Sequence, residues 1–313
     1  MSGPAAAGSA SYLDPELLAA LSPLRLRAAR VADGWSAGGF LSRRYGSSVD
    51  FADHKAYSSG DDVRHIDWKL NARTDRFYVR RFNAESSRLF HFLLDGSGSM
   101  GYRGSRSPWS KWDCAATLAA SLMTVSLGGG DAAGWSIAAG KTEAGGGASQ
   151  FEPSQSSQVL DRFTRAADGH RPAGQIALAS DIRLLASTLK RRTNIVVISD
   201  WLDPIQGLRM AIAEVLFAGH QVLAAQVLDR DEVDFPGGRP AVFVDAEDAS
   251  AVHADPRAAA AGYADAFERH QRALEEVCQQ LSRTGGRFAV QRLLSDRPLA
   301  IPVAAWLDSA SGN

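Results

Sequence analysis

The stretch Leu93-Leu-Asp-Gly-Ser-Gly-Ser-Met100 joins an apolar run to a loop rich in side-chain oxygens. The apolar residues predict a buried strand that ends at Asp95. Ser97 and Ser99 follow at alternate positions, so three oxygen ligands converge beyond the strand. Hard cations such as Mg²⁺ bind oxygen ligands in a near-octahedral shell and retain several waters. One carboxylate and two hydroxyls leave such a cation short of negative charge, so we expect a partner to supply a further anionic ligand.

Downstream of this loop, strand-like and helix-like segments alternate. Such alternation is typical of a parallel sheet covered by helices on both faces. The sequence therefore predicts an α/β fold with a doubly wound, mostly parallel sheet. Strands are predicted at 89–94, 132–139, 194–199, 221–228, 241–245 and 287–292, with a hairpin loop at 140–150. Helices are predicted at 111–127, 157–167, 181–190, 203–218, 256–283 and 298–307, with a break at Gly262 left open.

A smaller, partly β subdomain is predicted upstream of the sheet domain. It contains a helix at 13–33, a Gly- and Ser-rich stretch at 34–46 and a strand at 77–82. The domain limits that we predict are 1–11 for a disordered tail, 12–85 for the N-terminal subdomain, 86–308 for the sheet domain and 309–313 for a second tail.

Composition excludes several classes of function. The formal net charge of the 313-residue chain is −1, so no general attraction to nucleic acid is expected. The two cysteines, Cys114 and Cys278, lack the spacing of a metal site. No apolar run reaches the roughly 18 residues that a membrane span requires, and no secretory signal is present. We therefore expect a cytoplasmic protein that has no membrane span and does not bind nucleic acid.

Two sets of residues resemble known families. The Asp95-x-Ser97-x-Ser99 pattern resembles the metal-ion-dependent adhesion site of von Willebrand factor A domains, and Ile198-Ser-Asp200 stands where that family places a further carboxylate. The motif GDDVRHIDWKLNAR at 60–73, with the segment 39–51, resembles the bacterial family called domain of unknown function 58. Together the matching segments cover residues 34–228.

The resemblance implies a non-enzymatic, metal-dependent adaptor or assembly factor that works with a MoxR-type AAA+ ATPase. The implied cation is Mg²⁺, or Mn²⁺ or Ca²⁺, and a partner protein donates an acidic residue to it. The implied ligands are Asp95, Ser97, Ser99, Ser180 and Asp200. Ser180 replaces the threonine that the family usually has. Asp200 has an alternative interpretation as a helix cap, a role for which Asp203 competes.

The 60–73 motif carries charges of both signs around apolar residues. One interpretation is an ion-pair network that holds the N-terminal subdomain on the sheet domain, since Arg pairs with carboxylates in bidentate fashion. The other is a second functional surface for a partner or an anion.

Trp201, directly after Asp200, also has two interpretations: it is either an exposed partner contact or a core residue. The residues concerned are Asp61, Asp62, Arg64, Asp67, Trp68, Arg73 and Trp201.

Two other functions stay open. A metal-dependent hydrolase would use the cation at Asp95 with Asp61, Asp67 or His65, and a structural protein would keep the loop as an empty turn. Hydrolytic magnesium sites usually cluster several carboxylates, whereas this one is rich in hydroxyls. The residues therefore favour binding over catalysis.

Overall fold

The computed structural model describes residues 51–58, 66–74, 76–82, 87–139, 149–189, 192–235, 240–283, 288–297 and 299. These residues belong to two compact units, and the boundary between the units falls in the chain between Ser87 and Arg88. Each unit is described by itself. The predicted helices at 13–33 and 298–307 and the predicted domain limits at 12 and 308 lie outside the described residues.

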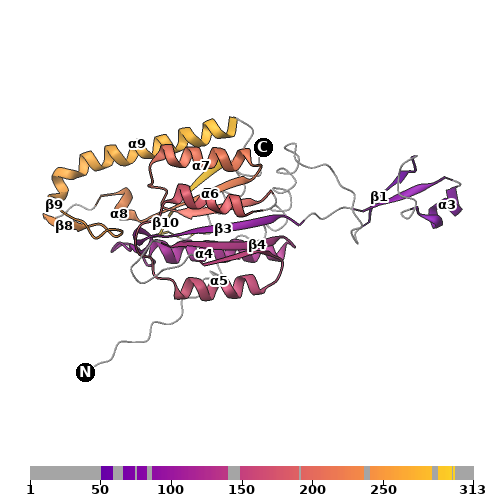
Figure 1. The fold of residues 1–313 in the computed structure, drawn as a ribbon, viewed down its shortest axis with the longest axis horizontal. Coiled ribbons are helices and arrows are strands. Elements are labelled where there is room, and N and C mark those ends of the chain that lie inside the picture. The colour runs from indigo at the N-terminus through magenta and orange to yellow at the C-terminus, as the bar shows by residue number, and fades with distance from the viewer. Residues whose placement is uncertain are drawn as a thin grey trace, which may run out of the picture. The chain divides into compact units, whose positions relative to one another are not determined.

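The larger unit is built on a six-stranded sheet with the strand order β10-β7-β6-β3-β4-β5 (Figure 1). Neighbouring strands run parallel except β5, which pairs antiparallel with β4 at one edge. The strands are β3 (Leu89–Gly96), β4 (Ala132–Ala139), β5 (Ser149–Ser154), β6 (Asn194–Ser199), β7 (Gln221–Leu228) and β10 (Phe288–Leu294). The predicted mostly parallel α/β sheet is confirmed.

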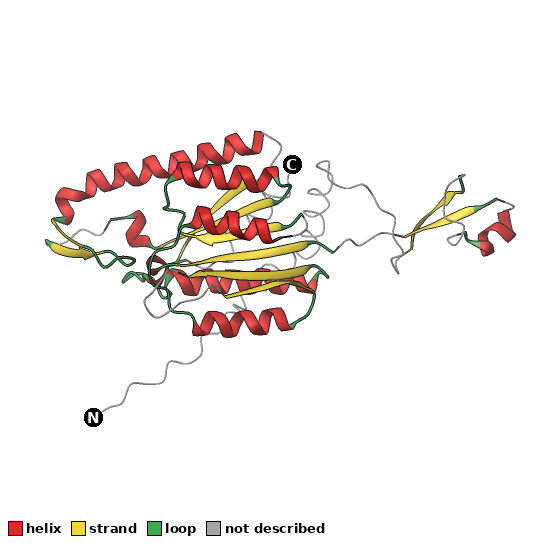
Figure 2. Ribbon diagram, viewed as in Figure 1, coloured by secondary structure: helices red, strands yellow, loops and turns green. Residues whose placement is uncertain are grey.

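Helices cover both faces of this sheet (Figures 1 and 2). Helices α4 and α5 lie on one face, and α6, α7 and α9 lie on the other. The bounds are α4 (Lys111–Gly128), α5 (Gln158–Gly169), α6 (Leu178–Thr188), α7 (Ile205–Phe217), α8 (Arg230–Val233), α9 (Pro256–Arg283) and the 3₁₀ helix η2 (Gly98–Gly101). The fold is therefore doubly wound, as predicted.

Helix α4 shows how local sequence determines an element that borders the site. The Ser110 hydroxyl accepts a hydrogen bond from the Asp113 N–H, and the Asp113 carboxylate accepts one from the Ser110 N–H. This capping box satisfies N–H groups that a helix start otherwise leaves unpaired. Gly128 to Gly130 end the helix, as the sequence predicts, because glycine is a weak helix former. The cap places Lys111 at the first position of α4.

The second sheet of the larger unit is the antiparallel hairpin of β8 (Ala241–Val244) and β9 (Ala251–Ala254). Only β8 is predicted from the sequence. Phe243 of β8 stacks on Phe235 at 5.5 Å between ring centroids, and Phe235 packs at 4.6 Å on Tyr263 of α9. Aromatic contacts therefore hold the hairpin against the long helix.

The structure resolves one open alternative among the helix predictions and moves the start of one helix, and two short helices, α8 and one within the 60–73 motif, are not predicted. Helix α9 continues unbroken through Gly262. Nothing lies within 4 Å of a Cβ built there, so no neighbouring atom requires glycine at this position. Helix α6 begins at Leu178, three residues before the prediction. A further short helix, α3 (Trp68–Thr74), lies within the 60–73 motif and has no counterpart in the prediction.

The smaller unit contains β1 (Phe51–Ala56), α3 and β2 (Tyr78–Phe82), and β1 pairs antiparallel with β2. The buried Asp67 accepts a hydrogen bond from the Leu70 N–H at 3.1 Å and so caps α3. A partly β N-terminal subdomain is therefore present in the described residues. No described helix in either unit is long and apolar enough to cross a membrane.

Candidate metal centre

Two central strands bring the predicted carboxylates together. Strands β3 and β6 are parallel neighbours, with Leu94 opposite Ile198. Asp95 and Asp200 therefore leave the same edge of the sheet on adjacent strands. Ser199 joins them, because its hydroxyl donates to Asp95 Oδ2 at 2.6 Å. Ligand sites of open α/β sheets form at this edge, outside the carboxyl ends of the strands.

The two serines of the loop after β3 extend this oxygen cluster. Ser97 Oγ and Ser99 Oγ are 3.0 Å apart, and Ser99 donates to Asp200 Oδ2 at 2.9 Å. The Ser97 N–H donates to Asp95 Oδ1 at 2.8 Å, which fixes the loop against the strand end. Four of the five predicted ligands, Asp95, Ser97, Ser99 and Asp200, thus form one connected group.

Lys111 is a member of the site that the sequence prediction missed. Its side chain is fully buried, and its ammonium donates to Asp200 Oδ2 at 3.0 Å and to Glu232 Oε1 at 2.5 Å. Glu232 in turn accepts from the Asp229 N–H at 2.7 Å, which links the site to α8. A sequence signal existed, because a cation in the first turn of a helix interacts unfavourably with the helix dipole. Lys111 at that position therefore indicates a carboxylate partner nearby.

The two buried carboxylates differ in their electrostatic setting. Burial raises the pKa of Asp95 to about 6, with a further increase from Asp200 that hydrogen bonds from Ser199 and Ser97 only partly offset. Burial also acts to raise the pKa of Asp200, but Lys111 outweighs it and holds that pKa below its usual value. Among the described residues no basic side chain forms an ion pair with Asp95. The Asp95 side of the site therefore lacks a compensating positive charge.

Trp201 is a core residue. Its side chain is fully buried, and its ring lies 5.8 Å from that of Phe288. The alternative of an exposed partner contact is therefore wrong. Trp201 has a φ of 56°, which is rare for a bulky residue. Its N–H donates to Ser199 Oγ, and its carbonyl accepts from His270, so both neighbouring peptides are held while Asp200 turns toward the site.

Ser180 is placed differently from the other predicted ligands. It lies in the first turn of α6 rather than in a loop, and its side chain is exposed. No hydrogen bond joins its hydroxyl to the four clustered residues in the described part of the chain. Asp203 lies within electrostatic range of the cluster: burial and then the charges of Asp95, Asp200 and Glu247 raise its pKa to about 6. A role for Ser180 as a ligand stays a prediction without a supporting contact.

The 60–73 motif is only partly described. Asp61, Asp62, Arg64 and His65 lie outside the described residues. Asp67 caps α3, and Arg73 is exposed in the last turn of that helix. Trp68 is 63% exposed and packs edge to face on Phe77, which is 51% exposed. The described part of the motif thus presents an aromatic pair at the surface of the smaller unit.

The oxygen spacing tests whether a cation fits the cluster. Ligands of Mg²⁺ lie at about 2.1 Å in a near-octahedral shell, so neighbouring ligand oxygens are about 3.0 Å apart. The Ser97–Ser99 and Ser99–Asp200 oxygen distances of 3.0 and 2.9 Å are those of hydrogen bonds between these atoms and are also compatible with this edge. No group of three or more His, Cys, Asp or Glu residues able to hold a metal ion occurs in the described chain, so the fit depends on the serine hydroxyls.

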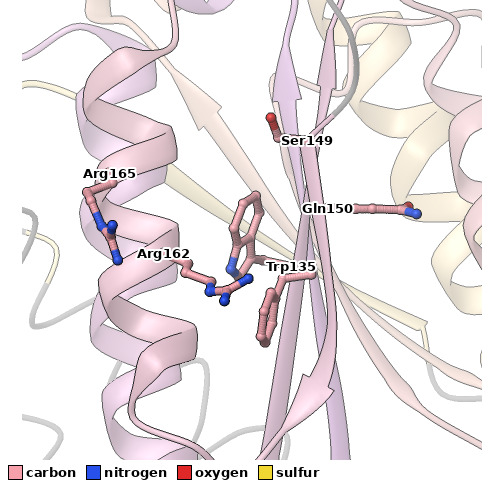
Figure 3. Close-up of a pocket in the computed structure, with 6 residues that line it drawn as sticks. Trp135, Ser149, Gln150, Arg162 and Arg165 are labelled. Atoms are coloured by element: carbon pink, nitrogen blue, oxygen red, sulfur yellow. The ribbon is translucent and has the colours of Figure 1, made fainter.

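A hollow on another part of the larger unit has a different character. It has a volume of about 320 Å³ and is lined by Trp135, Ser149, Gln150, Phe151, Arg162 and Arg165. Arg162 of α5 lies over the Phe151 ring at 5.0 Å from its centroid. Figure 3 shows both arginines on α5 and Trp135 on the neighbouring strand. None of the clustered oxygen ligands lines this hollow.

Comparison with known proteins finds relatives that match most of the chain. A family model described as "Protein of unknown function DUF58" matches residues 53–277. Uncharacterized proteins of Mycobacterium bovis (strain ATCC BAA-935 / AF2122/97) and Mycobacterium tuberculosis (strain ATCC 25618 / H37Rv) are each 32% identical over 234 residues, which are 75% of this chain and 72% of each relative.

Solved structures also resemble the chain. An aerotolerance-related membrane protein from Bacteroides fragilis NCTC 9343 is 16% identical, over 72% of this chain and 98% of that one, with a TM-score of 0.43. A von Willebrand factor type A structure from Catenulispora acidiphila is 16% identical, over 64% of this chain and 44% of that one, with a TM-score of 0.33.

Proposed function

We propose that this chain, which belongs to the family described as protein of unknown function DUF58, is a non-enzymatic, metal-dependent protein-binding adaptor or assembly factor. The proposed cation is Mg²⁺, or Mn²⁺ or Ca²⁺, bound by Asp95, Ser97, Ser99 and Asp200. A partner protein supplies an acidic side chain to it. The family resemblance suggests a MoxR-type AAA+ ATPase as that partner.

The observation that supports this proposal most strongly is the spacing of the oxygens at the carboxyl edge. Two hydroxyls and a carboxylate oxygen are joined by hydrogen bonds of 3.0 and 2.9 Å, so they already lie as close together as neighbouring ligands of one octahedral shell. The side of the site at Asp95 has no basic partner in the described chain, whereas Asp200 already has Lys111. A bound divalent cation would supply the positive charge that Asp95 lacks.

The donor set also supports binding over hydrolysis. The described ligands are two hydroxyls and two carboxylates, and Lys111 draws one of those carboxylates into an ion pair. A cation held in this way keeps a strong preference for another anionic ligand, and an acidic side chain of a partner meets that preference. We therefore propose that the cation bridges two proteins instead of activating a water.

Metal titration of the full chain tests the ligand set. Ser99→Ala should weaken Mn²⁺ binding about 10-fold or more in calorimetry, as loss of groups that support a metal site typically does. Ser187→Ala is the matched control, because Ser187 is an exposed serine of α6 that bonds only to its own helix at the Leu184 carbonyl. Ser180→Ala should equal this control if Ser180 is not a ligand.

The partner is tested by capture of the purified MoxR-type ATPase encoded in the same genome. We expect Mg²⁺-dependent capture by the wild type and loss of capture with chelator or with Ser99→Ala. Capture that survives both treatments would contradict the metal bridge. Metal-dependent hydrolysis of a phosphoester or peptide by the purified chain would contradict the non-enzymatic role.

A further inference from the structure

The turn of the β8–β9 hairpin, residues 245–250, packs directly on the ligand loop, residues 97–99, which carries Ser97 and Ser99. A Cβ built on Gly98 would be 2.0 Å from the Ala246 carbonyl oxygen and 3.3 Å from the Glu247 Cα. Real side chains never approach backbone oxygens so closely, so only glycine fits at this position. Backbone therefore meets backbone where the ligand loop passes beneath the turn.

The turn has its own internal support. Asp245 Oδ1 accepts hydrogen bonds from the N–H groups of Glu247 at 2.7 Å and Asp248 at 3.3 Å. Ala249 then adopts a left-handed conformation with a φ of 59°, and the chain returns along β9. Because these contacts define the backbone, they also define where the Glu247 side chain starts.

The Glu247 side chain starts beside the ligand loop, because the Glu247 Cα lies 3.3 Å from a Cβ built on Gly98. Burial raises the pKa of Glu247, the charges of Asp200 and Asp95 raise it further, and the nearby Ser99 side chain partly offsets this increase. Glu247 therefore lies within electrostatic range of Ser99, Asp200 and Asp95. In the described chain it forms no ion pair with a Lys or Arg side chain. An anion is therefore brought to two other anions by a turn that packs on the ligand loop.

We propose that Glu247 is an internal carboxylate ligand of the cation, so that the hairpin turn occupies the position that a partner's acidic side chain must take. This inference rests on the proposed function, because it requires a cation among Asp95, Ser97, Ser99 and Asp200. A carboxylate on the same chain has a high effective concentration at the site, so it completes the shell whenever no partner competes. A partner then binds by displacing the turn.

Binding of Mg²⁺ to the full chain tests the role of Glu247. Glu247→Gln should weaken Mg²⁺ binding about 10-fold in calorimetry, because the amide is a poorer ligand for a hard cation. Asp248→Asn removes the same charge from the same turn, but the Asp248 side chain is exposed and accepts from the Ser250 N–H. This control should bind Mg²⁺ like the wild type.

Hydrogen exchange supplies a second measurement that does not depend on affinity. Mg²⁺ should slow exchange of the amides at 246–249 in the wild type and in Asp248→Asn, but not in Glu247→Gln. Equal Mg²⁺ affinity in all three proteins, with no change of exchange in the turn, would overturn the internal ligand.

Ser99→Ala separates the two proposals. If Ser99→Ala abolishes Mg²⁺ binding while Glu247→Gln does not weaken it, the metal site stands and only the role of Glu247 is overturned. If the wild type does not bind Mg²⁺, or if Ser99→Ala binds it like the wild type, the proposed function fails and the internal ligand fails with it.

Discussion

The carboxyl ends of β6 and β3 hold the same chemical group in opposite electrostatic settings. Asp200, after β6, shares the fully buried ammonium of Lys111 with Glu232. Asp95, at the end of β3, receives only hydrogen bonds from Ser97 and Ser199. The pKa is accordingly lowered at Asp200 and raised to about 6 at Asp95. One strand end is thus neutralised by the protein itself, and the other has the charge deficit that a cation would fill.

His91, in the body of β3, is a buried titratable group that has neither an ion-pair partner nor a place at the proposed cation site. His91 is buried and bonds through Nε2 to Ser136 Oγ at 2.6 Å, while its Nδ1 has no partner. Burial lowers the pKa of His91 to about 4, so the ring stays neutral near pH 7. His91 thus avoids a buried charge by staying neutral, whereas Asp200 keeps its charge beside Lys111.

Removing the Lys111 ammonium beside the end of β6 should have the largest effect. Lys111→Met keeps the length of the side chain but leaves Asp200 and Glu232 buried without their ammonium. We expect the free energy of unfolding to fall by about 3–5 kcal/mol, as it does when one member of a buried ion pair is removed. Urea unfolding followed by circular dichroism measures this change.

Arg183→Met is the matched control for Lys111. Arg183 pairs with Glu214 at 2.8 Å on exposed faces of α6 and α7. Exposed pairs of this kind contribute about 0–1 kcal/mol. If both substitutions cost the same, burial does not distinguish the two ion pairs and the contrast between the strand ends is lost.

The pH dependence of stability should show the neutral state of His91. Its pKa is about 4 in the folded protein and near 6.5 when unfolded, so between these values the unfolded state binds more protons. Stability from this residue is fully present above pH 6.5 and is lost as the pH falls toward 4, by roughly 3 kcal/mol.

His91→Gln isolates this contribution, because glutamine keeps a group near the Ser136 hydroxyl and does not titrate. Asp95 and Asp203 have raised pKa values of about 6 and change stability in the opposite sense over this range. The measured quantity is therefore the difference between wild type and variant in urea unfolding at several pH values. A difference that does not vary with pH would show that the pKa of His91 is the same in the folded and unfolded states, which contradicts the predicted effect of burial.

The two carboxylates should respond to the same substitution with opposite signs in metal-free protein at pH 7. Asp200→Asn removes a partner of Lys111 and should destabilise the fold by about 2 kcal/mol, since Glu232 still contacts the ammonium. Asp95→Asn removes an uncompensated charge and should stabilise the fold by about 1 kcal/mol, because relief from burial is partly offset by weaker hydrogen bonds.

Thermal unfolding with chelator present and then with Mg²⁺ measures both changes. Mg²⁺ should stabilise the wild type and leave Asp95→Asn unchanged, because a ligand stabilises only the folded state that binds it. Equal destabilisation by the two variants without metal would break the comparison between the strand ends.

The sequence by itself determined the sheet and the chain positions of its polar ends. Apolar runs that stop at Asp95 and Asp200 carry their own periodicity, and the capping box of α4 is a signal within four residues. These features depend on neighbours along the chain, so they are readable from the amino-acid order. The apolar runs were sufficient to predict the parallel sheet and the loop with Asp95, Ser97 and Ser99, whereas Asp200 was predicted from the family resemblance.

Only the tertiary structure decided how the charges of the site are balanced. Lys111 meets Glu232 from 121 positions away, and Glu247 comes near Ser99 through a hairpin of which the sequence predicted only one strand. Trp201 is buried and Ser180 is exposed because the packing of α6, α7 and α9 orients them, not because of adjacent residues. Electrostatic compensation acts through space between remote segments, so local pattern predicts the ligands but not the cation and carboxylate that surround them.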